Sequence, residues 1–349
     1  MVFDHPEFDG HQQVTFVSDG ATGLKALVAI HHLRGPSAGG GVRFRPYDSI
    51  DAALTDVLRL SRAMTFKMVL AGLPMGGAKS VVIGDPAIDK TPELLLAFGR
   101  YVASLDGRYT AGPDVGTNAD DMEILAGVTE HVAGRASGAG STAPPTAIGV
   151  FNGIWATAAA AYGGDTLEGR RVAVQGAGGV GSHLVGHLVE AGAEVVVADV
   201  DPSAAEAVAD RHRATVAAAD EILSADVDIL SPNAVGGILN ADTIPTIRAT
   251  AICGGANNQL AHTSDGATLT ERGILWAPDY VVSAGGAIAG SWEVGHITEA
   301  ERDTMLDAIF STTLDILTEA IARQQPTDDV ARDRVRALLA EERSEAASI

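Results

Sequence analysis

Several features that would restrict the function of this chain are scarce or missing. It has one cysteine, Cys253, so no intramolecular disulfide can form. Its first residues show neither the basic start nor the apolar run of a secretion signal. Apolar stretches such as 195–198 end at a charge or a glycine well before the roughly 20 residues that a membrane span needs. We therefore expect a protein of the reducing cytoplasm that does not cross a membrane.

Positive charge is also scarce. The chain has 24 Lys and Arg against 45 Asp and Glu, a net charge of −21, and no local basic cluster. Nucleic-acid phosphates would be repelled, so nucleic acid is not expected as a partner. The acidic surplus fits a salt-rich cytoplasm and a solubilising surface equally well, and both interpretations stay open. Only four of the basic residues are lysines, namely Lys25, Lys67, Lys79 and Lys90.

The length of 349 residues and the 46% hydrophobic content favour two domains. In the first part, 13–30 contains two apolar runs around the turn DGATG, which predicts a hairpin. A helix is expected after Ser49, a strand at 80–84 and a helix over 91–105. The first domain is thus predicted to be α/β.

The second part begins after a Gly, Ser, Ala and Pro-rich segment at 136–145. Apolar strands then alternate with helices, which predicts a Rossmann-type, doubly wound parallel sheet. We expect domains at 1–140 and 141–319, with a helical end at about 320–349 that packs back on the first domain.

A glycine motif lies between the predicted strand 171–175 and the helix that follows. Its spacing, G-x-G-x-x-G, together with this strand and helix context, predicts a dinucleotide site whose phosphates meet the helix N-terminus. Asp199 follows about 20 residues later, where a carboxylate binds the ribose 2′-hydroxyl, so NAD is expected as the cofactor. The motif consists of Gly176, Ala177, Gly178, Gly179, Val180 and Gly181.

His183 and His187 are four residues apart on the helix of this motif, a spacing that two ligands of one metal can have. No Glu adjoins the first histidine and no third ligand is evident. We expect packing or surface histidines and no metal site.

A second set of residues lies in the first domain: Lys67, Lys79 and Asp114. Deamination of an amino acid needs a cation for the substrate carboxylate, a base of lowered pKa and an acid that shuttles a proton. Two lysines and an aspartate can supply all three. From spacing alone, the lysines could equally be solvated loop residues.

Here the sequence resembles the glutamate/leucine/phenylalanine/valine dehydrogenase family. The resemblance runs from Gly35 to Thr117 and continues in TAIGV, the glycine motif, SPNAVGG, ANNQL and APDYVVSAGG, in the family's order. It implies two domains around a deep cleft, a small amino-acid or 2-oxo-acid substrate and a homo-oligomer.

The resemblance also implies roles for individual residues. Lys67 matches the lysine that binds the substrate carboxylate, Lys79 the catalytic lysine and Asp114 the aspartate that assists proton transfer. The remaining matches are Gly40 and Gly41 beside the substrate, and Thr146, Asn233, Ala234, Asn257 and Asn258 at the cofactor.

The chain departs from the family pattern at three positions. Ser283 stands where the family usually has Asn, which puts a hydrogen bond to substrate or nicotinamide in doubt. Met68 and Val42 replace residues that are commonly Asn and Thr, so polarity around the site is reduced.

Several positions bear on the substrate side chain. Glutamate-specific members of the family have a lysine just before the glycine pair, which meets the side-chain carboxylate of the substrate. This chain has Ala38 and Gly39 there, so glutamate is not expected. By the resemblance, four pocket positions carry smaller residues than leucine dehydrogenases have, which favours phenylalanine or tryptophan. If Met68 or Trp292 refills the space, a branched-chain substrate is favoured instead. The four positions are Gly39, Gly112, Ala287 and Gly290.

We therefore expect an NAD-dependent oxidative deamination, reversible, that yields the 2-oxo acid, ammonium and NADH. A rival from another class is a catalytically silent NAD-binding protein. The joint presence of Lys67, Lys79 and Asp114 argues against that rival, because a pure binder needs neither base nor acid.

Overall fold

The computed structural model describes residues 2–164 and 166–346. Their contacts divide the chain into two compact units, of which the first comprises residues up to 142 together with 287–302. The remaining described residues form the second unit. The two-domain α/β class expected from the sequence is confirmed. The units differ from the expected domain bounds in two segments: 287–302 belongs to the first unit, and 320–346, which was expected on the first domain, belongs to the second.

The first unit is built on a five-stranded mixed sheet of order β1-β2-β4-β3-β5. Strands β1 and β2 form the predicted antiparallel hairpin, with Gln13 opposite Ile30, while β3 runs parallel to β4 and β5. The elements are η1 (Val2–Asp4), β1 (Gln13–Asp19), β2 (Leu24–His32), β3 (Ala38–Arg45), α1 (Ile50–Leu70), β4 (Gly76–Ile83), α2 (Pro92–Ser104), β5 (Tyr109–Pro113) and α3 (Ala119–Ala126).

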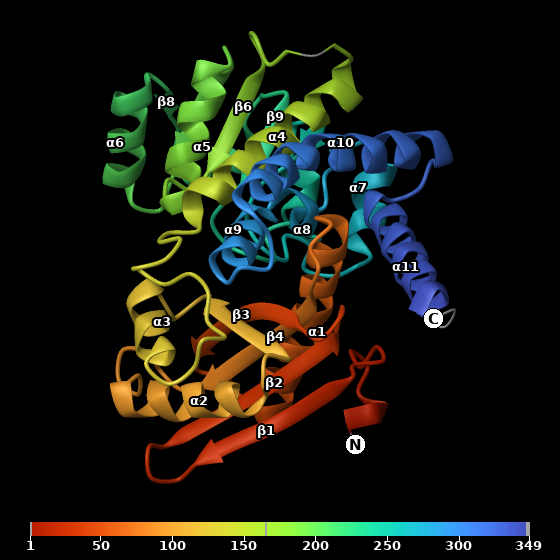
Figure 1. Cartoon of the computed structure of the whole chain (residues 1–349). Helices are drawn as coiled ribbons and strands as arrows, with labels where there is room; N and C mark the ends of the chain where they lie inside the picture. Colours follow the sequence, from red (N-terminus) through yellow and green to blue (C-terminus); the bar gives the residue numbers. More distant parts are fainter. Residues whose placement is uncertain (1, 165, 347–349) are drawn as a thin grey trace. The chain divides into compact units, whose positions relative to one another are not determined.

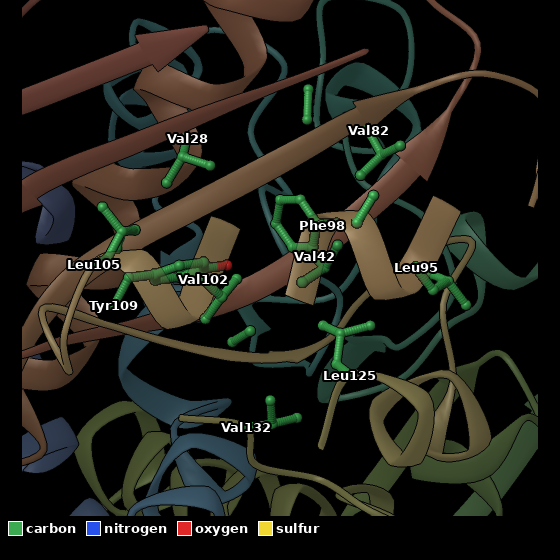
Figure 2. Close-up of a cluster of buried hydrophobic side chains, with 14 of the residues drawn as sticks. Val28, Val42, Val82, Leu95, Phe98, Val102, Leu105, Tyr109, Leu125 and Val132 are labelled. Carbon is green, nitrogen blue, oxygen red and sulfur yellow. The ribbon is translucent and has the colours of Figure 1, made fainter. Parts of the chain in front are cut away.

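Helices cover both faces of this sheet (Figure 1). In β2, Leu27 belongs to a buried cluster with Val57 of α1, and its neighbour Val28 belongs to another with Phe98 of α2. Figure 2 shows the second cluster, in which strand valines meet α2. Because successive side chains of a strand point to opposite faces, burial on both sides explains why β2 reads as a continuous apolar run.

The predicted helix after Ser49 is confirmed as α1, and the Ser49 hydroxyl caps it by accepting from the Ala52 amide at 3.0 Å. α1 packs tightly on β4, since a Cβ added at Gly77 would lie 1.9 Å from the backbone nitrogen of Thr65. Residues 38–45 lack the apolar alternation that is typical of a strand, so β3 is not expected from the sequence. The glycines of β3 let the neighbouring backbone approach, and a Cβ at Gly40 would lie 1.7 Å from the carbonyl oxygen of Ala78.

The second unit holds a parallel sheet of order β11-β10-β9-β6-β7-β8, as the Rossmann-type prediction required. The chain leaves β6 to one side for β7 and returns to the other side for β9, which makes the edge between β6 and β9 a topological switch point. The elements are α4 (Ala143–Tyr162), β6 (Arg171–Gln175), α5 (Gly179–Glu190), β7 (Glu194–Ala198), α6 (Pro202–His212), β8 (Thr215–Val216), η2 (Ile222–Ser224), β9 (Ile229–Pro232), η3 (Ile244–Thr246), β10 (Ala251–Ile252), α7 (Asp265–Glu271), β11 (Leu275–Trp276) and α8 (Asp279–Val282).

The C-terminal part is helical, as expected: α9 (Gly285–Glu293), α10 (Glu299–Arg323) and α11 (Thr327–Ala346). The start of α11 is bound within the second unit, where the Thr327 hydroxyl donates to the Trp276 carbonyl at 2.6 Å and the Tyr280 hydroxyl to Asp328 at 2.7 Å. These contacts differ from the expected return of this end to the first domain. None of the helices in the described part of the chain has the length and apolar character that crossing a bilayer requires.

Candidate active site

A buried ion pair lies at the centre of the first unit's sheet. Lys79 of β4 and Asp114, the residue after β5, approach across the intervening strand β3, with 3.1 Å between Nζ and Oδ2. Gly41 of β3 makes room for them: a Cβ added there would lie 3.0 Å from Nζ of Lys79 and 2.8 Å from Cβ of Asp114. Both side chains are almost fully buried, with 7% and 11% exposed. Three predicted site residues thus meet at one point.

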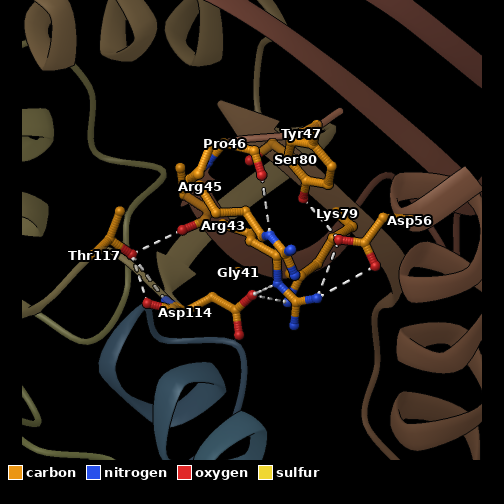
Figure 3. Close-up of polar contacts among 12 residues, drawn as sticks. Gly41, Arg43, Arg45, Pro46, Tyr47, Asp56, Lys79, Ser80, Asp114 and Thr117 are labelled. Atoms are coloured by element: carbon orange, nitrogen blue, oxygen red, sulfur yellow. Dashed lines mark hydrogen bonds and ion pairs between the residues drawn. The ribbon is translucent and has the colours of Figure 1, made fainter. Parts of the chain in front are cut away.

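Three further side chains extend this pair into a network that sequence reasoning missed (Figure 3). Arg43 of β3 donates from Nε to Oδ2 of Asp114 at 2.8 Å and from a terminal nitrogen to Asp56 of α1 at 3.1 Å. The Tyr47 hydroxyl donates to the same Asp56 carboxylate at 2.7 Å. The indication in the sequence was Arg43 itself, which follows Gly41 by two residues and lies on β3, next to the strand of Lys79.

The network sets the charge states of the central pair. Burial lowers the pKa of Lys79, the Asp114 carboxylate acts to raise it, and the Arg43 guanidinium lowers it further; the net pKa lies below the ordinary value. Burial acts to raise the pKa of Asp114, but Lys79 and Arg43 outweigh it, so the net pKa of Asp114 is lowered. Asp114 is therefore ionised at neutral pH, and Lys79 loses its proton more easily than a solvated lysine.

A tight turn holds Asp114 in place. The Thr117 hydroxyl accepts a hydrogen bond from the Asp114 amide at 2.9 Å and donates to the Val42 carbonyl of β3 at 2.8 Å. Thr117 therefore links the turn after β5 to the strand that carries Arg43.

The other predicted substrate residues are divided between the units. Lys67 lies buried on α1, with 9% of its surface exposed. Gly39 and Gly112 lie on the paired strands β3 and β5, and a Cβ added at Gly290 would lie 3.3 Å from Ala133. Gly290 and Ala287 of α9 belong to the first unit with these residues.

Ser283 belongs to the second unit instead. Its hydroxyl donates to the carbonyl of Asp279 at 2.6 Å, one turn earlier in α8, and the side chain is 5% exposed. The hydroxyl is therefore engaged in capping its own helix.

The glycine motif of the second unit forms the turn between β6 and α5. Gly176 has φ of +100°, and a Cβ added at Gly181 would lie 1.8 Å from the carbonyl oxygen of Gly176. Space above Gly178 is open, with no atom within 4 Å of an added Cβ. Asp199, after β7, accepts from the Ala177 amide at 2.7 Å. Open backbone at a helix N-terminus, with a carboxylate beside it, fits a dinucleotide.

Further predicted cofactor residues gather at the same edge of the sheet. Asn233, after β9, donates to Ser231 and accepts from the Gly255 amide at 2.8 Å, and Ala234 lies against Gly176. The Asn258 amide donates to Asp279 at 2.8 Å, and the Asn257 carbonyl lies beside Gly236.

Thr146 lies near the start of α4, also in the second unit. Its backbone nitrogen would lie 2.9 Å from a Cβ added at Gly285. Among the described residues, no three metal-binding side chains are grouped together. His187 packs its ring against Phe151, with 5.8 Å between the ring centroids.

Comparison with known proteins matches both units of this chain. A family model described as "Glu/Leu/Phe/Val dehydrogenase, dimerisation domain" matches residues 11–131, and one described as "Glutamate/Leucine/Phenylalanine/Valine dehydrogenase" matches residues 201–330.

Individual relatives cover nearly the whole chain. A valine dehydrogenase of Streptomyces virginiae is 45% identical over 322 residues, covering 90% of each chain. An L-tryptophan dehydrogenase of Nostoc punctiforme is 42% identical, covering 95% of this chain and 94% of that one. The crystal structure of L-tryptophan dehydrogenase from Nostoc punctiforme matches with a TM-score of 0.82 and 41% identity, covering 95% and 97% of the two chains. On these similarities, the chain belongs to the glutamate/leucine/phenylalanine/valine dehydrogenase family and is an amino-acid dehydrogenase, an oxidoreductase acting on CH–NH2 groups.

Proposed function

We propose that this chain catalyses the NAD-dependent oxidative deamination of an apolar L-amino acid, with Lys79 as the base and Asp114 as the proton shuttle. The observation that carries the proposal is the buried ion pair between these two side chains, 3.1 Å apart. A lysine of lowered pKa next to an ionised carboxylate is a base and a proton acceptor held within reach of each other.

In this mechanism Lys67 binds the substrate carboxylate as a cation. A bound nicotinamide supplies the hydride acceptor that converts the amine to an imine. Neutral Lys79 takes a proton from water as the water oxygen bonds to the imine carbon, giving a carbinolamine. The ionised Asp114 accepts that proton from Lys79 and passes it to the amine nitrogen. The carbon–nitrogen bond then breaks, ammonia leaves, and Lys79 takes the proton of the hydroxyl oxygen as the 2-oxo acid forms.

Family membership implies a nicotinamide cofactor, NAD or NADP. We propose NAD, held by the glycine motif and Asp199. The Asp199 carboxylate already accepts from the Ala177 and Asp201 amides at 2.7 and 2.9 Å, which fixes its position while it retains capacity for ribose hydroxyls. A 2′-phosphate would meet the negative charges of Asp199 and Asp201.

We further propose that the chain acts as a homo-oligomer in the cytoplasm. The description "dimerisation domain" for the model that matches residues 11–131 supports self-association through the first unit. Sedimentation velocity on the purified chain tests this, and a monomer at micromolar concentration would contradict it.

Two substrate classes compete. An aromatic side chain is favoured by the small residues at Gly39, Gly112, Ala287 and Gly290, all in the first unit, and by the relatives named tryptophan and phenylalanine dehydrogenase. Gly112 and Gly290 both adjoin Ala133, so small residues are grouped there.

One observation favours the second candidate, a branched-chain substrate. The Cε methyl groups of Met75 and Met68 would lie 2.9 and 3.0 Å from a Cβ added at Gly39, so methionines fill the space that the glycine leaves. The Ser291 hydroxyl contacts the Met75 sulfur at 3.2 Å. Relatives named valine dehydrogenase support the same candidate.

The substrate test is NADH formation with phenylalanine, tryptophan, leucine, valine and glutamate, repeated with Met75→Ala. We expect kcat/KM to be highest for an aromatic amino acid. Because Met75 is flexible and lies over Gly39, Met75→Ala is expected to raise the aromatic-to-valine ratio about tenfold. A preference for valine in the parent chain that reverses in Met75→Ala would establish the branched-chain candidate.

The chemical test is Lys79→Ala. Loss of the base is expected to lower kcat by at least about a thousandfold, with NADH binding unchanged. Lys79→Gln gives a variant of similar size, and the exposed lysine of β2, Lys25→Ala, is the matched control. Turnover that survives in Lys79→Ala would refute the assignment of the base.

A further inference from the structure

We propose that Arg43 is a positioning residue that lets Lys79 act as a base, by holding the same carboxylate oxygen of Asp114 that the lysine contacts. The inference rests on the proposed role of Lys79 in deamination. It assigns a task to Arg43, Asp56 and Tyr47, which the proposed mechanism leaves unused.

The geometry shows one carboxylate oxygen shared by two cations. Oδ2 of Asp114 lies 3.1 Å from Nζ of Lys79 and 2.8 Å from Nε of Arg43 (Figure 3). Arg43 is also held at its far end, where Asp56 accepts from it at 3.1 Å and Tyr47 in turn donates to Asp56 at 2.7 Å. Because both ends are bound, the guanidinium keeps its place when the lysine changes its charge.

The network contains equal numbers of positive and negative side chains. When all four are ionised, Lys79 and Arg43 balance Asp114 and Asp56. A buried carboxylate paired with a lysine alone would be left unpaired when the lysine releases its proton to solvent, which is costly. Arg43 remains bound to the same oxygen after that step, so Asp114 keeps a partner while Lys79 is neutral.

The charged groups around Lys79 act in opposite directions. Arg43, from β3, lowers the pKa of Lys79, whereas Asp114 at the end of β5 and Asp56 from α1 raise it. Burial raises the pKa of Tyr109 of β5, and the nearby Asp114 carboxylate raises it further, so its hydroxyl is neutral and adds no charge to the network. Removing Arg43 or Asp56 should therefore move the proton affinity of Lys79 in opposite senses.

The experiment compares Arg43→Gln with Asp56→Asn. In the pH profile of kcat/KM for deamination, the acidic limb of Arg43→Gln is expected to move to higher pH by about one unit. In Asp56→Asn, which keeps an oxygen for Arg43 and Tyr47, the limb is expected to move to lower pH. Arg43→Lys keeps the charge, so its acidic limb should lie close to that of the parent chain, and Asp56→Asn covers the case in which Arg43→Gln fails to fold. Limbs that stay in place, or move in the same direction in both variants, would overturn the proposal.

A second readout needs no turnover. The chain has only four lysines, so selective 13Cε labelling gives four lysine signals, and Lys79→Gln identifies that of Lys79. The titration midpoint of the Lys79 signal should rise in Arg43→Gln and fall in Asp56→Asn. If Arg43 had a merely structural role, its replacement would lower activity without moving this midpoint. If Lys79→Ala keeps its turnover, the proposed function fails. If Lys79→Ala is inactive and the midpoint is the same in all variants, only the role of Arg43 fails.

Discussion

The glycine motif of the second unit and the ion pair of the first unit are built in different ways. Six consecutive residues, from Gly176 to Gly181, make the turn of this motif largely from backbone, and Asp199 adds one carboxylate to it. The network around Lys79 draws side chains from α1, β3, β4 and the residue after β5. A site made by local backbone leaves a short motif in the sequence, whereas a site made by side chains from separate elements leaves isolated residues.

The largest effect is expected where backbone contacts define the turn of the glycine motif. Gly181→Ala places a Cβ 1.8 Å from the Gly176 carbonyl oxygen, which neither a rotamer nor a flexible neighbour can relieve. We expect a loss of about 3 kcal/mol in the free energy of unfolding, measured by thermal unfolding without nucleotide. Gly178→Ala, where space is open, should lose less than about 1 kcal/mol. Equal stability of the two variants would show that backbone packing is not what the motif requires.

An intermediate effect is expected for a side chain that positions the ion pair. Thr117→Val removes the hydroxyl that accepts from the Asp114 amide and donates to Val42. The two lost hydrogen bonds are expected to cost about 1–3 kcal/mol of stability and, because Asp114 is then less well placed, to lower kcat about tenfold. Thr117→Ser keeps the hydroxyl and should retain activity. A fully active Thr117→Val would mean that the strands alone position Asp114.

The smallest effect concerns a buried histidine of the first unit that lies outside the ion-pair network. Burial lowers the pKa of His31 to about 3, and its ring accepts from the Thr65 hydroxyl and donates to the Asp9 carbonyl. Below the ordinary pKa of about 6.5 the unfolded chain binds a proton that the folded chain does not. The stability contribution of neutral His31 is therefore complete above pH 6.5 and is lost as pH falls towards 3.

Urea unfolding of the parent chain and of His31→Asn between pH 7 and pH 5 measures this contribution. For each chain the free energy of unfolding is plotted against pH. The slope of the parent chain is expected to exceed that of His31→Asn by up to about 1.4 kcal/mol per pH unit. Parallel slopes would show that His31 does not titrate on unfolding in this range.

The hairpin, α1, α2 and the strands of the Rossmann-type sheet follow from patterns within single segments, and the structure confirms them. The strand at 38–45 does not follow from such a pattern. Its glycines are required because the backbones of neighbouring strands approach them closely, and a local sequence pattern does not reveal such contacts. The same reason explains why Met75 was missed: its methyl group fills the space above Gly39, 36 positions away in the chain.

By itself, the sequence determined the fold class, the turn expected to bind the dinucleotide and the identity of Lys67, Lys79 and Asp114 as the residues to examine. Those features depend on spacing within segments or on motifs in order along the chain. Only the tertiary structure decided that Lys79 and Arg43 share one carboxylate oxygen of Asp114, and that α1 contributes Asp56. Strand order puts β3 between β4 and β5, and it is this pairing of distant segments that brings the charges together.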